Sequence, residues 1–405
     1  MCAVLSETRW GMRDESDGPV SVYLDYNATA PIRPEALAAV VDALQAVGNA
    51  SSVHHPGRDA AYRVEVARRH LADLLNCSPG EIIFTSGATE ANNLALRAAH
   101  RRGARIVTSG AEHPAVLETA RDLAQNEPGS LTVLPMRADG LVETVALEEE
   151  LGRGDVGLVS LMAANNETGV LTDLTPVVKA AHAAGALVHT DATQMIGRLP
   201  LDLSEVDVDL LSLSAHKFGG PQGIGALFVR RGTPLPFRPL ITGGGQEKGW
   251  RAGTLNVPGI AGAGAAAAAA SRDLADDAAR VTRLRDQLEH MVTTAVDGCR
   301  INGQQTLRLP GVASITFAGA PADAVMAAMP RIAASDGSAC ASGAPTPSHV
   351  LLAMGLSREE AECTVRFSLG YATTEEEIAA TAEAVVHAVH QVRAAMAPTA
   401  GAAAH

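Results

Sequence analysis

The stretch ALVHTDATQMIGRLPLDLSEVDVDLLSLSAHK, residues 186–217, decides the fold class of this 405-residue chain. It contains two short apolar runs, ALVHT and VDLLSLS, joined by a longer polar connection. Asp191 follows the first run, and Lys217 comes shortly after the second. Short apolar runs of this kind are typical of strands in a parallel sheet that is covered on both faces. The stretch therefore predicts an α/β fold.

The same alternation extends outward from this stretch. The runs EIIFTSG, RIVTS, LTVLPM, VGLVSLM and GALFVR alternate with helical stretches between residues 81 and 230, which predicts a mostly parallel sheet with helices on both faces. After about Val257 a long alanine-rich helix runs to about Val296. The strands SITFA and TVRFSLG and a final helix at 373–396 then predict a smaller α+β unit.

These patterns divide the chain into two domains. We expect a large domain at 21–275 and a small C-terminal domain at 276–396. We also expect a disordered leader at 1–20 and a disordered tail at 397–405. The first ordered segment, about 21–33, could instead pack on the small domain.

Composition excludes several classes of function. Hydrophobic residues make up 47% and charged residues 19%, which indicates a globular chain. The net charge of −13 argues against direct binding to nucleic acid or anionic membrane, and no apolar run reaches the roughly 20 residues of a membrane span. The N-terminus lacks the apolar core of a signal peptide. Five scattered cysteines without a CxxC pair argue against a disulfide framework or a metal site, so we expect a cytoplasmic protein.

Polar clusters follow four of the predicted strands. They comprise residues 85–89 after EIIF, 165–167 after LVSLM, 191–194 after LVHT and 214–217 after LLSL. In open α/β sheets, ligands bind beyond the carboxyl ends of the strands. The four clusters therefore predict one shared site at that edge of the sheet.

Lysine is rare in this chain, which singles out Lys217. The three lysines are Lys179, Lys217 and Lys248, so 29 of the 32 residues that are Lys or Arg are arginine. An arginine cannot replace a nucleophilic amine, because its guanidinium stays protonated. Lys179 lies in a helical stretch typical of a solvated face and Lys248 in a glycine-rich one, whereas Lys217 follows a buried strand.

A lysine and an aspartate at strand ends suit the cofactor pyridoxal phosphate. This cofactor needs a lysine for covalent attachment and an acid that keeps its ring nitrogen protonated, for which Lys217 and Asp191 are the candidates. It also needs a phosphate site. The segment TSGATEANNLAL provides a glycine turn that opens onto a helix N-terminus, with the hydroxyl of Thr89 nearby. Each piece alone is as readily a helix cap, but their order and spacing favour the cofactor.

The chain resembles the NifS/IscS-type cysteine desulfurases of the class V aminotransferase superfamily. The resemblance runs from YLDYNATAP at residue 23 to RFSLGYATTEEE at residue 377. Its segments are GNASSVHHPGR, IIFTSGATEANNLAL, EHPAV, NNETGV, HTDATQMIGRLPLDL, SAHKFGGPQGIGAL, GGGQEKGWRAGTLNVPGI, SDGSACASG, PSHVLLAMGL and VRFSLG. It implies the fold type I of pyridoxal-phosphate enzymes, with a mostly parallel large domain and a smaller C-terminal α+β domain.

The resemblance implies a cofactor site with defined roles. Lys217 would hold the cofactor covalently, Asp191 would pair with its ring nitrogen, and Gln194 would bond its ring hydroxyl. The implied phosphate ligands are Ala88, Thr89, Ser214 and His216, with Thr254 reaching in from the partner subunit of a homodimer.

The resemblance also implies a substrate site for L-cysteine. His113 of EHPAV would stack on the cofactor ring and assist proton transfer, while Asn166 and Arg366 would bind the substrate carboxylate. An arginine is the natural two-pronged partner of a carboxylate. His113 also follows the predicted strand RIVTS, which places it at the site edge.

Cys340 is the candidate for carrying sulfur. It lies in ASDGSACASGAPTPSHV, a run of small and turn-forming residues that predicts an exposed loop. In the implied reaction, Lys217 or His113 removes the Cα proton of bound cysteine, and the Cys340 thiolate takes the sulfur as a persulfide. Alanine leaves, and the sulfur passes by thiol exchange to an acceptor protein. For the other cysteines, Cys2, Cys77, Cys299 and Cys363, we expect inert thiols.

The sequence departs from the family pattern at three places. Asp336 stands where a small serine is more usual, GAPTPSH contains two prolines, and the N-terminal leader is long. The alternatives are a related C–S or selenocysteine lyase, an aminotransferase, or an inactive scaffold protein. The destination of the sulfur stays open among iron–sulfur assembly, tRNA thiolation, DNA phosphorothioation and a specialised biosynthesis.

Overall fold

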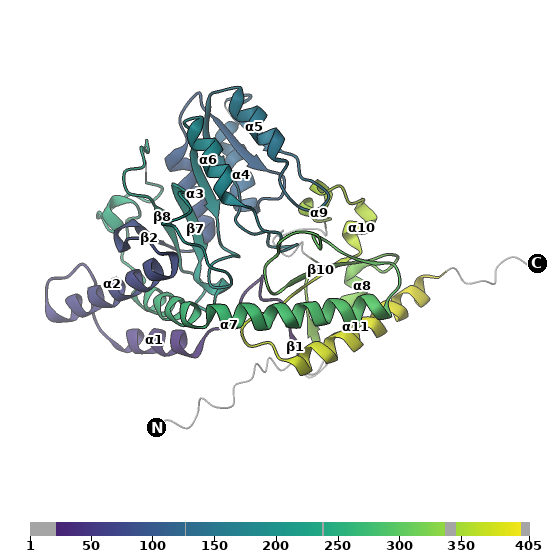
Figure 1. Ribbon diagram of the computed structural model, residues 1–405. Helices are drawn as coiled ribbons and strands as arrows, with labels where there is room; N and C mark the ends of the chain where they lie inside the picture. The colour runs from purple at the N-terminus through teal and green to yellow at the C-terminus, as the bar shows by residue number, and fades with distance from the viewer. Residues whose placement is uncertain (1–21, 126, 237–238, 337–345, 398–405) are drawn as a thin grey trace, which may run out of the picture.

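A seven-stranded sheet lies at the centre of the computed structural model, which describes residues 22–125, 127–236, 239–336 and 346–397 (Figure 1). Its strands are β2 (Ile82–Thr85), β3 (Arg105–Ser109), β4 (Leu131–Leu134), β5 (Val156–Ser160), β6 (Leu187–Asp191), β7 (Leu210–Ser214) and β8 (Gly225–Val229). The order is β2-β8-β7-β6-β5-β3-β4. β8 pairs antiparallel with β2 and β7, and the other pairs are parallel. The predicted mostly parallel α/β sheet is confirmed.

Alternate residues of the central strands pack on opposite faces of this sheet. Leu187 and Leu210 belong to the core on one face, whereas Val188 and Leu211 belong to the core on the other. Every residue of β5, β6 and β7 is buried. Burial on both faces explains why these strands are continuous apolar runs in the sequence.

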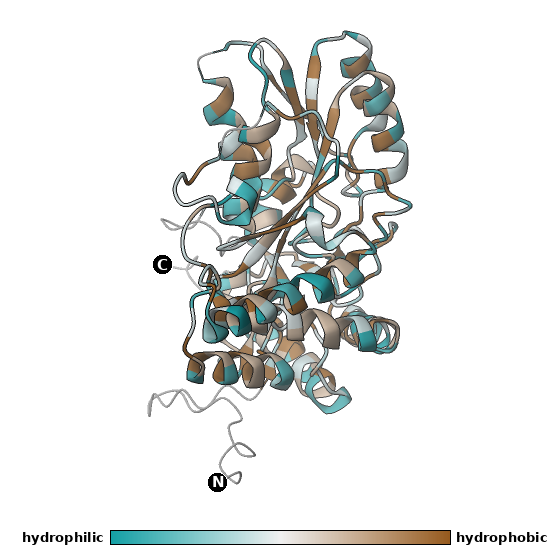
Figure 2. Ribbon diagram, turned by 90° about the vertical axis from the view of Figure 1, so that its left-hand side faces the viewer, coloured by the Kyte–Doolittle hydropathy of each residue, from teal (hydrophilic) through white to brown (hydrophobic). Residues whose placement is uncertain are grey.

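Helices cover both faces. α3 (Ala88–Ala99) and α4 (Pro114–Ala124) pack on the face that carries Leu187. On the other face lie α2 (His55–Leu75), α5 (Thr144–Gly152) and α6 (Leu174–Ala183), and α1 (Pro34–Gln45) packs beside them. In Figure 2 the strands are mostly brown, whereas the outer helices alternate between teal and brown, as expected for helices with one buried face.

A single helix of 39 residues, α7 (Val257–Ala295), runs along the base of the molecule (Figure 1). Its first half packs closely on α1 and α2, where a Cβ on Gly264 would lie 2.3 Å from the Cα of Ala67. Its second half contributes Val281 and Leu288 to the C-terminal core. The helix continues through residues 275 and 276, so the domain boundary that we predicted there would cut a continuous helix.

The C-terminal part is an α+β unit. β9 (Cys299–Ile301), β10 (Val312–Phe317) and β12 (Thr364–Ser368) form an antiparallel sheet in the order β12-β10-β9. Its helices are α8 (Ala322–Ala327), α9 (His349–Ala353), α10 (Arg358–Glu362) and α11 (Glu375–Met396). Three short 3₁₀ turns occur earlier in the chain, at η1 (Pro79–Glu81), η2 (Ala215–Lys217) and η3 (Glu247–Gly249).

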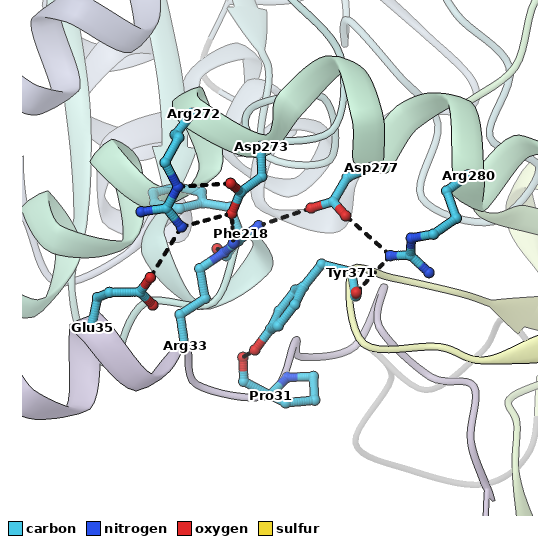
Figure 3. Close-up of polar contacts among 9 residues, drawn as sticks. All are labelled: Pro31, Arg33, Glu35, Phe218, Arg272, Asp273, Asp277, Arg280 and Tyr371. Carbon is cyan, nitrogen blue, oxygen red and sulfur yellow. Dashed lines mark hydrogen bonds and ion pairs between the residues drawn. The ribbon is translucent and has the colours of Figure 1, made fainter.

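The N-terminal segment joins regions that are distant in sequence. β1 (Val22–Tyr23) pairs in parallel with β11 (Ile332–Ala333) of the C-terminal part. Ten residues further on, the guanidinium of Arg33 forms ion pairs with Asp273 and Asp277 of α7 and lies 4.2 Å over the ring of Tyr371 (Figure 3). This segment is therefore attached to both the central and the C-terminal parts.

Two sequence predictions lie outside the described residues: the leader at 1–20 and the loop around Cys340. The tail predicted at 397–405 also lies outside the described residues, except for residue 397. None of the helices in the described ranges has both the length and the apolar composition that a membrane crossing requires.

Candidate active site

A cavity of about 450 Å³ opens beyond the carboxyl ends of the parallel strands. Residues that end or follow β2, β3, β5, β6 and β7 form most of its wall, with Arg366 of β12 and Asn27 and Ala28 of the N-terminal segment completing it. A cavity of this size can hold a small cofactor together with a substrate. It lies at the edge of the sheet that the strand-end clusters predicted.

Most of the predicted site residues line this one cavity. They are Ala88, Thr89, His113, Asn166, Asp191, Gln194, Ser214, His216, Lys217 and Arg366. Thr254 is not part of the lining, because it is exposed in the segment that precedes α7. Cys340 lies outside the described residues.

Asp191 is a fixed carboxylate at the end of β6. Its Oδ2 accepts a hydrogen bond of 2.7 Å from the side-chain amide of Asn92, and its Oδ1 accepts one of 3.0 Å from the N–H of Thr193. These two bonds hold the Asp191 carboxyl group in a defined orientation at the cavity.

Lys217 supplies the amine of the cavity. It lies in η2 directly after β7, and its Nζ donates to the carbonyl of Asn27 at 2.5 Å and to that of Ala28 at 2.8 Å. Of the three lysines, all within the described ranges, Lys217 alone lines the cavity, whereas Lys179 and Lys248 are exposed elsewhere. The amine that sequence reasoning selected is thus at the site.

The N-terminus of α3 forms an anion-binding corner of the cavity. The preceding residue, Gly87, offers no side chain to cap the first turn, so the N–H groups there stay available to a ligand. Ser214 lies beside it: a Cβ on Gly87 would be 3.8 Å from its Oγ. Glu90 of the same turn forms an ion pair of 2.9 Å with Arg251, which offsets its negative charge near this corner.

His113 has a defined protonation pattern. It caps α4, and its Nδ1 accepts a hydrogen bond of 3.0 Å from the N–H of Ala115. Burial lowers the pKa of His113 below its ordinary value, with Asp191 opposing that shift. A lowered pKa favours the neutral ring, and because Nδ1 is an acceptor, the neutral ring carries its proton on Nε2.

A buried acid lies directly before His113. Glu112 is fully buried, and its Oε1 accepts hydrogen bonds from Ser109 at 2.8 Å and from the N–H of Met162 at 2.9 Å. Its Oε2 has no partner among the described residues. Burial raises the pKa of Glu112 to about 8, so this residue is held as a neutral acid.

Two further histidines near the cavity are also held neutral. His189 lies two residues before Asp191 on β6. Its Nδ1 is 2.8 Å from the hydroxyl of Ser160, and its Nε2 is 3.0 Å from the hydroxyl of Ser212. Burial lowers the pKa of His189 to about 4. Burial, together with Lys217, lowers the pKa of His216 to about 4 as well. The positive charge that these rings could add is therefore absent at neutral pH.

Arg366 and Asn166 form the opposite wall. Arg366 is buried, and it donates from Nη2 to Asp25 at 2.8 Å and from Nη1 to the carbonyl of Asn166 at 3.0 Å. Its Nε has no partner among the described residues. A ligand carboxylate would therefore find an available donor on Arg366, although Asp25 already occupies part of the guanidinium.

The described cysteines lie away from the cavity. Cys77, Cys299 and Cys363 are absent from its lining, and burial raises the pKa of each thiol, that of Cys77 to about 12. A thiol with a raised pKa is a poor nucleophile, because little thiolate forms. None of these three suits the sulfur chemistry.

Both flanks of residues 337–345 are attached to residues of the site. Ser335 exchanges backbone hydrogen bonds of 3.1 and 2.6 Å with Arg366. On the other flank, the hydroxyl of Ser348 donates to Glu167, and His349 Nε2 donates to the carbonyl of Glu112 at 2.9 Å. One flank is therefore bonded to Arg366, which lines the cavity, and the other to Glu112 and Glu167, the sequence neighbours of the lining residues His113 and Asn166.

The residues fit pyridoxal phosphate. The anion corner at α3 suits the phosphate, the Asp191 carboxylate suits a protonated ring nitrogen, and Lys217 supplies the amine. Gln194 donates to the carbonyl of Asn27 at 3.0 Å, while its buried Oε1 has no partner in the described part of the chain. That oxygen is an acceptor for a ring hydroxyl.

Sequence reasoning missed several residues that organise the site. Asn92 contacts Asp191, Asn27 contacts Lys217, and Arg198 donates to Asn27. Asn92 could have been singled out from the sequence, because an amide within the apolar face of a helix is rarely buried without a polar partner. Asn27 lies in YLDYNATAP, a segment of the resemblance to which we assigned no role.

Comparisons with known proteins agree with this geometry. The sequence model of the aminotransferase class-V family matches residues 22–381. A cysteine desulfurase of Frankia sp. (strain EuIK1) is 43% identical over 387 residues, which cover 92% of each chain.

Solved structures give the same result. A NifS-like protein superposes with a TM-score of 0.84 at 35% identity, covering 91% of this chain and 99% of its own. The structure titled SspA in complex with cysteine has a TM-score of 0.76 at 33% identity, covering 86% of this chain and 99% of its own.

Proposed function

Because the chain belongs to the class V aminotransferase family, among the NifS/IscS-type cysteine desulfurases, we propose that it converts L-cysteine to L-alanine and takes the sulfur onto Cys340 as a persulfide. The observation that carries this proposal is the convergence of Lys217, Asp191, His113 and Arg366 on one cavity. These residues come from separate strands and loops, and together they bring an amine, a carboxyl group, an imidazole and a guanidinium to one site.

In this proposal, pyridoxal phosphate is held by residues of the cavity. Lys217 would hold it covalently, Asp191 would pair with its ring nitrogen, and Gln194 would bond its ring hydroxyl. Ala88, Thr89, Ser214 and His216 would hold its phosphate. When bound, the cofactor withdraws electrons from the Cα of the amino acid and so acidifies the Cα proton.

The protein's own groups then bind the substrate and move protons. Arg366 and Asn166 hold the carboxylate of cysteine, and the amine of Lys217 removes the Cα proton once the substrate has displaced it. We assign this base role to Lys217 because the Nδ1 of His113 is already an acceptor for Ala115. His113 instead stacks on the ring and donates from Nε2.

Sulfur transfer requires a thiolate. We propose that the Cys340 thiolate attacks the sulfur of bound cysteine: a sulfur–sulfur bond forms, and the carbon–sulfur bond breaks with its electron pair left on the substrate carbon. Protonation of that carbon, and return to Cα of the proton that Lys217 removed, give alanine. Two observations support Cys340: the described cysteines lie outside the cavity, and the flanks of its segment are attached to Arg366 and to Glu112 and Glu167.

We further propose a homodimer in which Thr254 of one subunit reaches the cofactor phosphate of the other. Thr254 is exposed and does not line its own cavity, and Leu44 and Val47, at and beyond the end of α1, are exposed apolar residues that a partner could cover. Mixing Lys217→Ala and Thr254→Ala proteins tests this arrangement, since a mixed dimer would contain one site with both native residues. Activity above that of either parent supports a shared site, and its absence contradicts it.

The working environment follows from the thiol chemistry. A persulfide on Cys340 has to be formed and discharged by exchange with another thiol, which suits the reducing cytoplasm. We propose a protein as sulfur acceptor, and its identity can be sought by capturing a disulfide-linked partner from cell extract.

The test of the proposed function is product analysis with Cys340→Ala. Wild-type protein should form alanine from cysteine together with protein-bound persulfide, and the variant should form neither while retaining the visible absorbance of the bound cofactor. Undiminished sulfide release by Cys340→Ala would favour a C–S lyase. Failure of the wild type to bind the cofactor would favour an inactive scaffold.

A further inference from the structure

Residues 27–33 lie along the loop that carries Lys217. The N–H of Ala30 donates to the carbonyl of His216 at 2.8 Å, and the N–H of Arg33 donates to the carbonyl of Gly219 at 2.8 Å. The Nε of Arg33 donates to the carbonyl of Phe218 at 3.2 Å. Consecutive residues of the lysine loop are thus bonded to a segment almost 190 positions earlier.

Asn27 is the residue of this segment that meets the reactive amine. Its main-chain carbonyl accepts hydrogen bonds from Lys217 Nζ at 2.5 Å and from Gln194 Nε2 at 3.0 Å. The carbonyl of Ala28 accepts a second bond from Lys217 at 2.8 Å. The position of the amine therefore depends on where these two carbonyls point.

The side chain of Asn27 is bonded on two sides, and its main-chain N–H donates to the hydroxyl of Ser368 at 2.9 Å. It is almost fully buried, and its amide spans two groups: Oδ1 accepts from the guanidinium of Arg198, and Nδ2 donates to the carbonyl of Asn166 at 2.8 Å. Arg198 in turn donates to the carbonyls of Tyr26 at 2.9 Å and Lys217 at 3.3 Å. One side chain therefore links the lysine loop to the wall that holds Asn166 and Arg366.

The far end of the segment is clamped independently. Arg33 is held by Asp273 and Asp277 of α7, and the hydroxyl of Tyr371 donates to the carbonyl of Pro31 at 2.9 Å (Figure 3). The clamp fixes the segment as a whole but does not contact Lys217 Nζ. A variant of this clamp can therefore serve as a control for a variant of Asn27.

We propose that Asn27 is a positioning residue for Lys217, and that its side chain holds its own carbonyl where the free amine docks during turnover. This inference rests on the proposed function, in which Lys217 alternates between the cofactor and a free state that takes the Cα proton. Asn27 touches the amine through its main chain, so its side chain acts on the reaction through that contact.

Asn27→Ala is the decisive variant, because it removes the bonds to Arg198 and Asn166 while keeping the backbone. We expect kcat for cysteine to fall by between about tenfold and a hundredfold, since small misplacements of a reacting group have effects of this size. We expect KM to change less than kcat, because Arg366 keeps its bonds to Asp25 and to the carbonyl of Asn166. Cofactor-free protein given pyridoxal phosphate should also acquire its visible absorbance about tenfold more slowly.

Tyr371→Phe is the matched control. It removes the hydrogen bond to Pro31 at the other end of the same segment and keeps the ring beside Arg33, so kcat and the attachment rate should stay at wild-type values. Asn27→Asp covers the case in which Asn27→Ala fails to fold. It keeps an acceptor for Arg198 and loses only the donor to Asn166, and it should show a partial loss in both rates.

Wild-type rates in Asn27→Ala, or equal losses in Asn27→Ala and Tyr371→Phe, would overturn the inference. In the case of equal losses, the segment would serve general stability alone. The attachment rate is measured without cysteine, so it tests Asn27 even if the wild type fails to produce alanine. Failure of the proposed function and failure of this inference are therefore distinguishable.

Discussion

The side-chain amide of Asn92 donates a hydrogen bond of 2.7 Å to Oδ2 of Asp191, which lies 99 positions later in the chain. This contact joins α3, whose N-terminus forms the anion corner, to the acid at the end of β6. The two ends of the proposed cofactor site are therefore fixed relative to each other by one amide.

Asn92→Ala should weaken this link. A hydrogen bond to a charged group contributes about 1.5–3 kcal/mol, so we expect kcat to fall at least tenfold and the affinity for pyridoxal phosphate to decrease. Absorbance titration and steady-state kinetics measure both. Asn93→Ala, which alters the neighbouring amide that bonds Thr89 instead, should leave kcat unchanged. An equal loss in the two variants would mean that helix stability is responsible.

Glu112 should make folding stability depend on pH. Burial raises its pKa to about 8 from an ordinary value of 4.5, so between these values the folded state holds a proton that the unfolded state has released. The contribution of this group to stability is therefore full below about pH 4.5 and is lost as the pH rises toward 8, by up to about 1.4 kcal/mol per pH unit.

Glu112→Gln removes this dependence. Glutamine can still accept from Ser109 and Met162, so the variant should gain stability relative to wild type as the pH rises from 5 to 8. Urea unfolding at several pH values measures the difference. Glu118→Gln, at an exposed position of α4, is the control. Parallel curves for wild type and Glu112→Gln would show that the proton is not held.

Ser348→Ala should be more destabilising than an ordinary cap removal. The Ser348 hydroxyl caps α9 through the N–H of Leu351 at 3.1 Å and also donates to the buried carboxyl of Glu167. Ser357 caps α10, which is equally short, through the N–H of Glu360 at 3.2 Å without contacting a buried acid. Loss of a cap alone costs about 1 kcal/mol.

We therefore expect the free energy of unfolding to fall by about 1–3 kcal/mol more in Ser348→Ala than in Ser357→Ala. Burial raises the pKa of Glu167 to about 7, so the excess should be larger at pH 8, where the carboxyl is charged, than at pH 6. If Ser348→Ala and Ser357→Ala lose the same free energy of unfolding at pH 6 and at pH 8, the contact with Glu167 contributes nothing.

Gly225→Ala should damage the anion corner. A Cβ at Gly225 would lie 2.5 Å from the carbonyl oxygen of Leu213 and 2.7 Å from the Cα of Gly87, so β8 would have to move away from the turn that opens α3. We expect the affinity for pyridoxal phosphate to fall by at least tenfold in absorbance titrations, a change of about 1.4 kcal/mol. Gly152→Ala, where a Cβ meets nothing within 4 Å, should bind normally. Normal binding by Gly225→Ala would contradict the role of this contact.

Features that depend on one short stretch of sequence could be predicted from it. The strands LVHT and LLSL were recognisable because burial on both faces keeps charged residues out of them, and Lys217 was recognisable because lysine is rare in this chain. The boundary predicted at residue 275 had less basis, since composition changes there while the helical pattern of α7 continues.

The contacts between distant segments could not be predicted. β1 and β11 have two residues each, too few for a periodic pattern. The amine of Lys217 bonds the main-chain carbonyl of Asn27, and a main-chain acceptor leaves no trace in residue identity. The neutral state of Glu112 depends on complete burial, which follows from packing and not from the motif EHPAV. Our proposal that Lys217 is the base likewise depends on the acceptor position of His113 Nδ1, which the sequence does not show.

The most direct test of the account is the location of sulfur after one turnover. Wild-type protein loaded with pyridoxal phosphate is given L-cysteine, blocked with an alkylating agent and digested, and each cysteine peptide is weighed by mass spectrometry. We predict one added sulfur on the peptide that contains Cys340, and none in Lys217→Ala. Sulfur on Cys77, Cys299 or Cys363, or alanine formation with no sulfur on any peptide, would contradict it.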